Sequence, residues 1–153
     1  MSADRITLDT NVLIYAFDNR DAFKQRVCAD IVVTAINEGY PLALQAIGEF
    51  YVAATRRRIL APARAAREAE KFVRGFETFL PSQGAYVLAA QEAACGTYSY
   101  WDAVLLVSAS DAGCDIILSE DMADGARLGA ITVRNPFGLR GLDEEARAWL
   151  GMG

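Results

Sequence analysis

Five short apolar runs alternate with longer helical segments along this chain, and this alternation is the strongest constraint on its fold. The runs have the length and composition of strands, while the segments between them place apolar residues at helical spacing. The runs cover 6–8, 41–44, 78–80, 115–119 and 130–133. Strands joined in this way pair in parallel and are covered on both faces. We therefore predict a three-layer α/β/α fold around a central parallel sheet of about five strands.

The intervening segments predict helices that begin or end at recognisable residues. They start near Val12 and then cover 22–37, the segment around 47–54, 62 to about 75, 85–94, 101–112 and a short amphipathic tail at 143–150. Gly39 and Gly113 fit helix ends, and Trp149 is expected to dock the tail. Because no repeat or linker interrupts the pattern, we expect one domain over 1–153.

Composition limits the compartment and the general class of the protein. Of 153 residues 53% are hydrophobic, which is typical of a globular chain. No apolar run is long enough to cross a bilayer, and a strand so close to the N-terminus leaves no room for a signal peptide. Cys28, Cys95 and Cys114 are odd in number and lie in apolar or small-residue surroundings. We expect buried thiols and a cytoplasmic location.

Four acidic residues stand beside apolar runs, where an isolated carboxylate is costly to desolvate. They are Asp9, Glu49, Asp102 and Asp121. Repeated tolerance of that cost indicates a compensating positive charge. The chain has no histidine and no paired cysteines, so the natural candidate is a hard divalent cation held by oxygen. The net charge of −5 argues against a protein that coats nucleic acid, but carboxylates awaiting a cation are themselves negative.

The expected fold allows these acids to converge. Asp9 and Asp121 follow strands, and ligands of open parallel sheets bind beyond the carboxyl ends of strands. Glu49 and Asp102 are expected in the first turns of helices. Each acid alone could serve only as a helix cap or a partner of the helix dipole. Capping does not require all of them at one edge of the sheet, whereas a metal site does.

Residues 9–15, Asp-Thr-Asn-Val-Leu-Ile-Tyr, resemble the opening motif of PIN-domain ribonucleases, particularly the VapC-like toxins of bacterial toxin–antitoxin pairs. Later motifs of that family are matched in the same order and at similar spacing by 49–50, 101–103 and 119–122. The likeness extends through the segment 131–137, so it covers nearly the whole chain. It implies endonucleolytic hydrolysis of RNA, suppression by a small antitoxin protein, and a homodimer.

The resemblance also implies roles for single residues. Asp9 and Asp102 would be the main ligands of magnesium or manganese, which activates a water molecule for the attack on phosphorus. The other implied roles belong to Glu49 and Asp121, which complete the acidic pocket, and to Asn11 and Ser119, which support it. Two alternatives stay open: Glu120 could replace Asp121 as the fourth acid, and Asp124 could be a further ligand or only a turn residue.

Basic and aromatic residues supply candidates for RNA binding. One basic run is Arg56-Arg57-Arg58, and a stripe at helical spacing comprises Arg64, Arg67, Lys71 and Arg74. The alternatives for the stripe are a solvated face paired with Glu68 and Glu70, or a groove for an acidic antitoxin segment. The aromatic candidates for base stacking are Tyr15, Phe50, Tyr51, Tyr98, Tyr100 and Trp101, with Tyr98 and Tyr100 favoured.

Two other classes of function compete with the nuclease. A phosphoryl-accepting signalling domain also places acids at strand ends, but it needs a nearby lysine. The chain has only Lys24 and Lys71, and neither belongs to a late strand-end motif. The second rival is a nonenzymatic RNA- or partner-binding module on a degenerate nuclease fold. The complete set of four acids argues against it.

Overall fold

All five predicted strands form, and each pairs in parallel with a neighbour in the computed structural model, which describes residues 4–138, 141–142 and 144–150. The strands are β1 (Ile6–Leu8), β2 (Pro41–Ala43), β3 (Glu77–Phe79), β4 (Ile116–Leu118), β5 (Arg127–Leu128), β6 (Ile131–Arg134), β7 (Phe137–Gly138) and β8 (Gly141–Leu142). The main sheet has the order β1-β4-β6-β5, and β2 pairs with β3. The hydroxyl of Thr7 in β1 donates to the Pro41 carbonyl at 2.7 Å, which joins the two parallel ladders.

Three short strands were not expected from the sequence. β5 runs antiparallel to β6, and β7 and β8 form a small antiparallel pair. Strands of two residues are too short to leave an alternating apolar pattern. They leave the parallel arrangement around β1 and β4 unchanged.

Every predicted helix is present, with small shifts at the ends. The helices are α1 (Thr10–Tyr15), α2 (Ala22–Asn37), α3 (Leu44–Arg56), α4 (Pro62–Gly75), α5 (Gln83–Ala94), α6 (Tyr100–Asp111) and α7 (Glu144–Leu150). α1 begins two residues before Val12, because Asp9 alone acts as its N-cap. Leu44, predicted as the end of a strand, instead begins α3. Consequently Glu49 lies in the second turn of that helix and not in its first.

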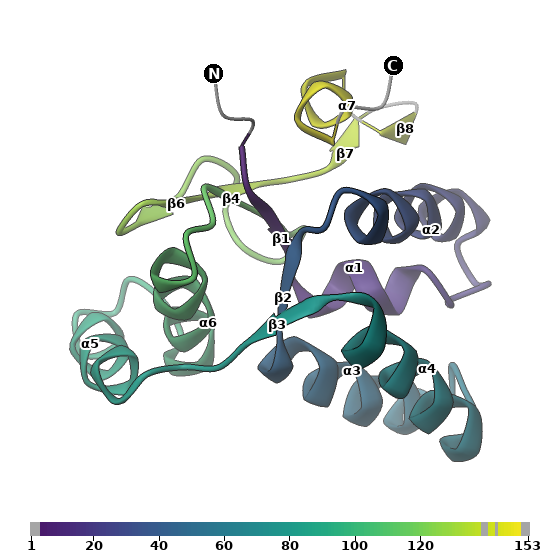
Figure 1. Cartoon of the computed structure of the whole chain (residues 1–153), viewed down its shortest axis with the longest axis horizontal. Helices are drawn as coiled ribbons and strands as arrows, with labels where there is room; N and C mark the ends of the chain where they lie inside the picture. The colour runs from purple at the N-terminus through teal and green to yellow at the C-terminus, as the bar shows by residue number, and fades with distance from the viewer. Residues whose placement is uncertain (1–3, 139–140, 143, 151–153) are drawn as a thin grey trace.

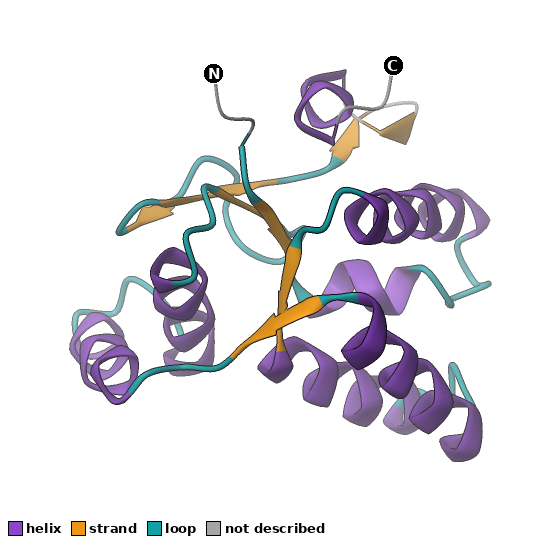
Figure 2. Ribbon diagram, in the orientation of Figure 1, coloured by secondary structure: helices purple, strands orange, loops and turns teal. Residues whose placement is uncertain are grey.

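The helices cover the strands from both sides. Helices α5 and α6 lie on one side and α1 to α4 on the other (Figure 1), with β1, β2 and β3 between them (Figure 2). α7 forms as predicted and Leu150 is fully buried, while the predicted contact of Trp149 lies outside the described side chains. Within the described residues, no helix is long and apolar enough to cross a membrane.

The two cysteines in the core are buried, but the third is not. Cys28 on α2 and Cys114 before β4 are almost inaccessible to solvent. Cys95 is exposed, which corrects the expectation of three buried thiols. It is the C-cap of α5, and none of the residues 91–95 at that end of the helix is buried.

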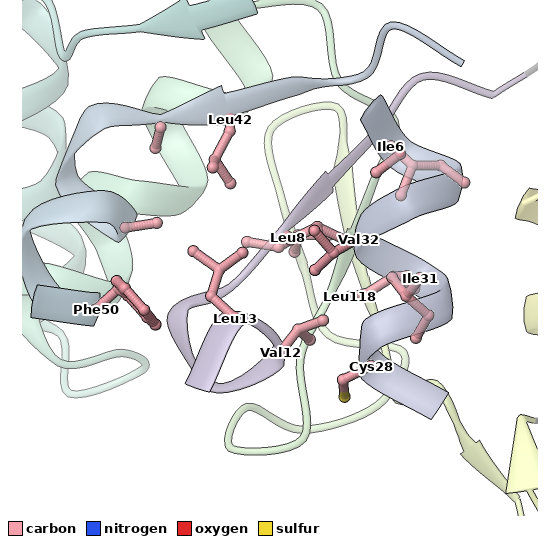
Figure 3. Packing of buried hydrophobic residues seen from close by; sticks show 14 of the residues in the cluster. Ile6, Leu8, Val12, Leu13, Cys28, Ile31, Val32, Leu42, Phe50 and Leu118 are labelled. Carbon is pink, nitrogen blue, oxygen red and sulfur yellow. The ribbon is translucent and has the colours of Figure 1, made fainter. Parts of the chain in front are cut away.

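The main core lies between β1, α1 and α2 on one flank and α3 and α4 on the other. Figure 3 shows side chains of β1, α1, α2, β2, α3 and β4 packed around Leu8. Phe50 of α3 is fully buried, and its ring centroid lies 5.6 Å from that of Phe17 and 5.1 Å from that of Phe72. Its burial excludes Phe50 from base stacking. The same burial fixes the helix that carries Glu49.

We expect Phe50→Ala to lower the free energy of unfolding by about 3–5 kcal/mol, because a fully buried aromatic side chain is replaced by a cavity. Urea denaturation at neutral pH measures this loss. Tyr51→Ala, the next residue along α3 but on its exposed surface, is the matched aromatic control, and it should cost less than about 1 kcal/mol. Equal losses in the two variants would contradict the assigned packing.

Candidate active site

Side chains from four separate parts of the chain line one cavity of about 200 Å³, and they include all four predicted acids, Asp9, Glu49, Asp102 and Asp121. Asp9 follows β1 and Asp121 lies three residues beyond β4; since these strands are parallel neighbours, both carboxylates reach the same edge of the sheet. α6 leads through a short turn into β4, so its first turn, which contains Asp102, lies at the edge where β4 ends. α3 follows β2 directly and brings Glu49 to the cavity.

Asp9 is the most firmly held of the four acids. Its side chain is buried, and its Oδ1 accepts a hydrogen bond from the backbone N–H of Thr10 at 2.7 Å. Its Oδ2 accepts from the hydroxyl of Ser119 at 2.8 Å and from Nδ2 of Asn11 at 3.2 Å. Three donors therefore fix the orientation of this carboxylate.

The two predicted supporting residues also bind each other and the segment after β4. The Ser119 oxygen accepts from Asn11 Nδ2 at 3.2 Å and from the backbone N–H of Met122 at 3.3 Å. Oδ1 of Asn11 accepts from the backbone N–H of Glu120, also at 3.3 Å. Both hydrogens of the Asn11 amide and its oxygen are thus used. The network ties the end of β1 to the end of β4.

Gln45, to which the sequence analysis assigned no role, connects Glu49 to α6. Its amide Nε2 donates to Glu49 Oε1 at 3.0 Å and to the backbone carbonyl of Trp101 at 3.1 Å. The other oxygen of Glu49 accepts from the Thr10 hydroxyl at 2.9 Å. A glutamine four residues before the acid on one helix was the available signal, because such side chains face each other.

Burial and mutual repulsion disfavour the charged forms of the two innermost acids. The pKa of Asp9 rises from 3.8 to about 6, mainly because burial penalises the carboxylate. Hydrogen bonds from Ser119 and Thr10 lower this pKa, and the charges of Asp102 and Asp121 raise it.

The pKa of Asp102 is also raised, again mainly by burial. A hydrogen bond with Ser99 opposes that effect, while the charges of Glu49 and Asp121 add to it. The acids of this cavity therefore repel one another, which is the electrostatic condition that a bound cation relieves.

The two residues that the sequence left as alternatives point elsewhere. Glu120 binds Lys24 and Tyr15 and does not line the cavity among the residues described, whereas Asp121 does. The carboxylate of Asp124 accepts from the backbone N–H of Asn135 at 2.9 Å, which is the role of a turn residue. The geometry thus favours Asp121 as the fourth acid.

The donor set suits a hard divalent cation, since the charged side chains available to it are carboxylates. In the described part of the chain, however, no three acidic or cysteine side chains are already close enough together to hold an ion. Binding would therefore require the less restrained carboxylates, such as the exposed Asp121, to turn toward the anchored Asp9.

Two hollows continue the acidic cavity in different directions. One shares Glu49, Ala53 and Arg57 with it and extends along α3, where its other lining residues are Gly48, Val52 and Arg56. The second shares Asp102 and Asp121 with it and is otherwise lined by residues 97–99, Met122, Ala123 and Ala126. We call the acidic cavity and the two hollows that share residues with it the trough.

Only some of the basic residues predicted to bind RNA line the acidic cavity or the hollows beside it. Arg57 lines the cavity and Arg56 the hollow beside it. Arg58 lies just beyond the end of α3 in a left-handed conformation, with φ of 56°. Among the described lining residues, none comes from the stripe on α4, where Lys71 pairs with Glu68 at 3.3 Å.

The aromatic residues predicted to stack on bases also differ in how far they are accessible to RNA. Tyr98 lines the second hollow and its hydroxyl donates to the Arg127 carbonyl at 2.9 Å. Trp101 is 56% exposed next to Asp102, and the Tyr100 ring packs against it at 5.0 Å between centroids. Tyr15 is engaged with Glu120.

Comparison with known proteins establishes the fold. No protein-family model matches the chain, and no curated protein matches its sequence. The solved structures that resemble it include VapC20 of Mycobacterium tuberculosis, described as a sarcin-ricin loop cleaving toxin, and FitAcB of Neisseria gonorrhoeae. VapC20 has a TM-score of 0.61 and 15% identity over 73% of this chain and 86% of its own. FitAcB has a TM-score of 0.55 and 15% identity over 86% of this chain and 97% of its own. The likeness confirms the predicted PIN-like α/β/α fold.

We expect Asp9→Asn to stabilise the metal-free protein at pH 7.5 by about 1–2 kcal/mol. One pKa unit corresponds to about 1.4 kcal/mol, and the amide forfeits part of the gain because it accepts fewer hydrogen bonds. The folded pKa of about 6 exceeds the unfolded value of 3.8, so the wild type loses stability as pH rises through that interval. The advantage of the variant should therefore shrink by about 1 kcal/mol at pH 5.

Urea denaturation in the presence of a chelator, at both pH values, measures this difference. Asp111→Asn, at the exposed far end of α6, is the control and should change the free energy of unfolding by less than about 0.5 kcal/mol. An Asp9→Asn variant that is equally destabilised at both pH values would contradict the buried, repelled carboxylate.

Proposed function

We propose that this protein is a divalent-metal-dependent endoribonuclease and the toxin of a toxin–antitoxin pair. The observation that carries the proposal is the gathering of four carboxylates from four distant segments around one cavity, next to Arg57. The fold likeness to VapC20, a toxin that cleaves the sarcin-ricin loop, supports RNA as the substrate.

Magnesium or manganese is the cofactor that this donor set fits, with Asp9 and Asp102 as main ligands and Glu49 and Asp121 completing the shell. When bound, such an ion lowers the pKa of a coordinated water and stabilises negative charge on a phosphoryl oxygen. The hydrogen bond from Ser119 orients Asp9 and opposes the effect of burial on its ionisation. Mutual repulsion among the acids favours cation binding over the empty state.

RNA would cross the site along the trough, with nucleotides on both sides of the acids, as cleavage within a chain requires. On the α3 side, Arg57 and Arg56 would bind phosphates, and Val52, which is 52% exposed, offers apolar contact to a base. On the other side, Tyr98 and the main chain around it would meet the strand. The α4 stripe is a weaker candidate for RNA binding, since its Lys71 and Arg74 are paired with Glu68 and Glu70.

The remaining parts of the proposal concern partners and location. A homodimer is supported by exposed apolar side chains on and before α5, which are Leu80, Tyr86, Val87 and Leu88. The free cysteines suit a reducing cytoplasm. The antitoxin is a small protein whose acidic segment would meet the basic residues of α3 or α4.

Asp102→Asn should reduce cleavage of a structured RNA in Mn²⁺ by more than about 100-fold, because it removes a ligand charge while the fold survives. Gel analysis of the products gives the rate, and circular dichroism checks the fold. Asp111→Asn makes the same chemical change at the opposite end of α6 and should cleave at the wild-type rate. Wild-type protein that binds RNA but never cuts it in Mn²⁺ would favour the nonenzymatic binding module.

Arg57→Ala should weaken RNA binding and reduce the salt dependence of that binding by about one charge, because one phosphate contact is lost. The measurement is the dissociation constant for a non-cleaved RNA at several salt concentrations. The triple variant Arg64→Ala/Arg67→Ala/Lys71→Ala tests the α4 stripe in parallel. A larger loss in the triple variant than in Arg57→Ala would place RNA on α4 instead of in the trough.

A further inference from the structure

Glu120 stands directly before the site residue Asp121, yet its side chain is bound on the opposite side of the chain. Its Oε2 lies 2.6 Å and its Oε1 2.9 Å from Nζ of Lys24 on α2. The hydroxyl of Tyr15, at the end of α1, donates to Oε1 at 2.6 Å. Both oxygens are therefore occupied, and we call these three side chains, Lys24, Tyr15 and Glu120, the clamp.

The clamp is shielded from solvent, which distinguishes it from an ordinary surface ion pair. The side chains of Lys24 and Glu120 are only 27% and 24% exposed. Nζ of Lys24 also lies 4.8 Å from the centroid of the Tyr15 ring and 5.1 Å from that of Phe137. Partly desolvated charges attract more strongly than exposed ones, and an unpaired one is costly.

The segment after β4 is consequently held at two successive residues in opposite directions. Ser119 binds Asp9 inside the site, and Glu120 is held outside it by the clamp. The backbone N–H of Glu120 is bound by Asn11 as well. The next side chain, Asp121, lines the cavity. With Glu120 fixed, its neighbour is restricted to the side that faces the acids.

We propose that Lys24 and Tyr15 are positioning residues for the metal site. They hold Glu120 out of the acidic cavity and thereby keep Asp121 directed into it. This inference rests on the proposed function, because it assigns the purpose of the clamp to the carboxylates that would bind the cation. Without the lysine, an uncompensated Glu120 would leave its pocket for water and would pull the adjacent Asp121 with it.

The test measures binding of Mn²⁺ alone, by the signal of free Mn²⁺ in electron paramagnetic resonance. Lys24→Met should weaken the affinity about tenfold, the scale expected when a group that orients metal ligands is lost. Lys24→Arg keeps the charge and should recover most of the affinity. Lys24→Met/Glu120→Gln should also recover most of it, because a neutral amide stays bonded to Tyr15 and need not leave the pocket. Kinetics at saturating Mn²⁺ should show Lys24→Met lowering kcat with little change in KM for RNA.

The matched control is Arg74→Met, which breaks an exposed pair with Glu70 on α4 and should leave Mn²⁺ affinity unchanged. Phe76→Leu, a core change at the C-cap of α4, shows what lower stability alone does to binding. The proposal is overturned if Lys24→Met binds Mn²⁺ like wild type, or if it loses no more than an equally destabilised Phe76→Leu. It is also overturned if the double variant stays as weak as Lys24→Met. If wild type and Asp9→Asn bind Mn²⁺ equally poorly, the proposed metal site is wrong. The purpose assigned to the clamp is then wrong as well.

Discussion

The parallel pairing of β1 with β4 is the constraint on which the site depends. In that register Leu8 stands opposite Leu118, so the residues that follow, Asp9 and Ser119, emerge side by side at one edge of the sheet. The hydroxyl of Ser119 can then hold the buried Asp9 carboxylate at 2.8 Å. Shifting one strand by a residue would reverse which side chains face the core and would separate the pair. The apolar packing on both faces of the sheet is what forbids such a shift.

The acids impose an electrostatic cost that the core must offset. Burial raises the pKa of Asp9 to about 6 and also raises the pKa of Asp102. The negative charges of Glu49 and Asp121 raise the pKa of Asp102 further. A sequence selected only for stability would not keep these charges together, and strained arrangements of this kind gather at functional sites. The same repulsion that weakens the metal-free protein would strengthen its hold on a cation. Stability and proposed function are therefore opposed at Asp9 and Asp102.

Most secondary structure was predictable because it follows from local patterns. The helix α2 matches its predicted bounds, 22–37, since an apolar stripe and a glycine stop define it within the segment itself. Errors occurred where local signals compete. Leu44 reads as part of an apolar strand, but the chain turns into α3 there. Contacts between distant segments leave no local pattern. Lys24 belongs to no late strand-end motif, yet it binds Glu120, and Gln45 bridges two helices across 56 residues.

By itself the sequence determined the alternation of strands and helices, the identity of the four acids and their positions beside apolar runs. Those properties are local, because they depend on residue type and on periods of two or 3.6 residues. The tertiary structure decided whether Glu120 or Asp121 faces the cavity and which arginines lie beside that cavity. It also decided which lysine forms an ion pair within the fold. These depend on the direction of a side chain relative to elements far away in the chain, and that direction is set by packing of the whole core, which no short segment contains.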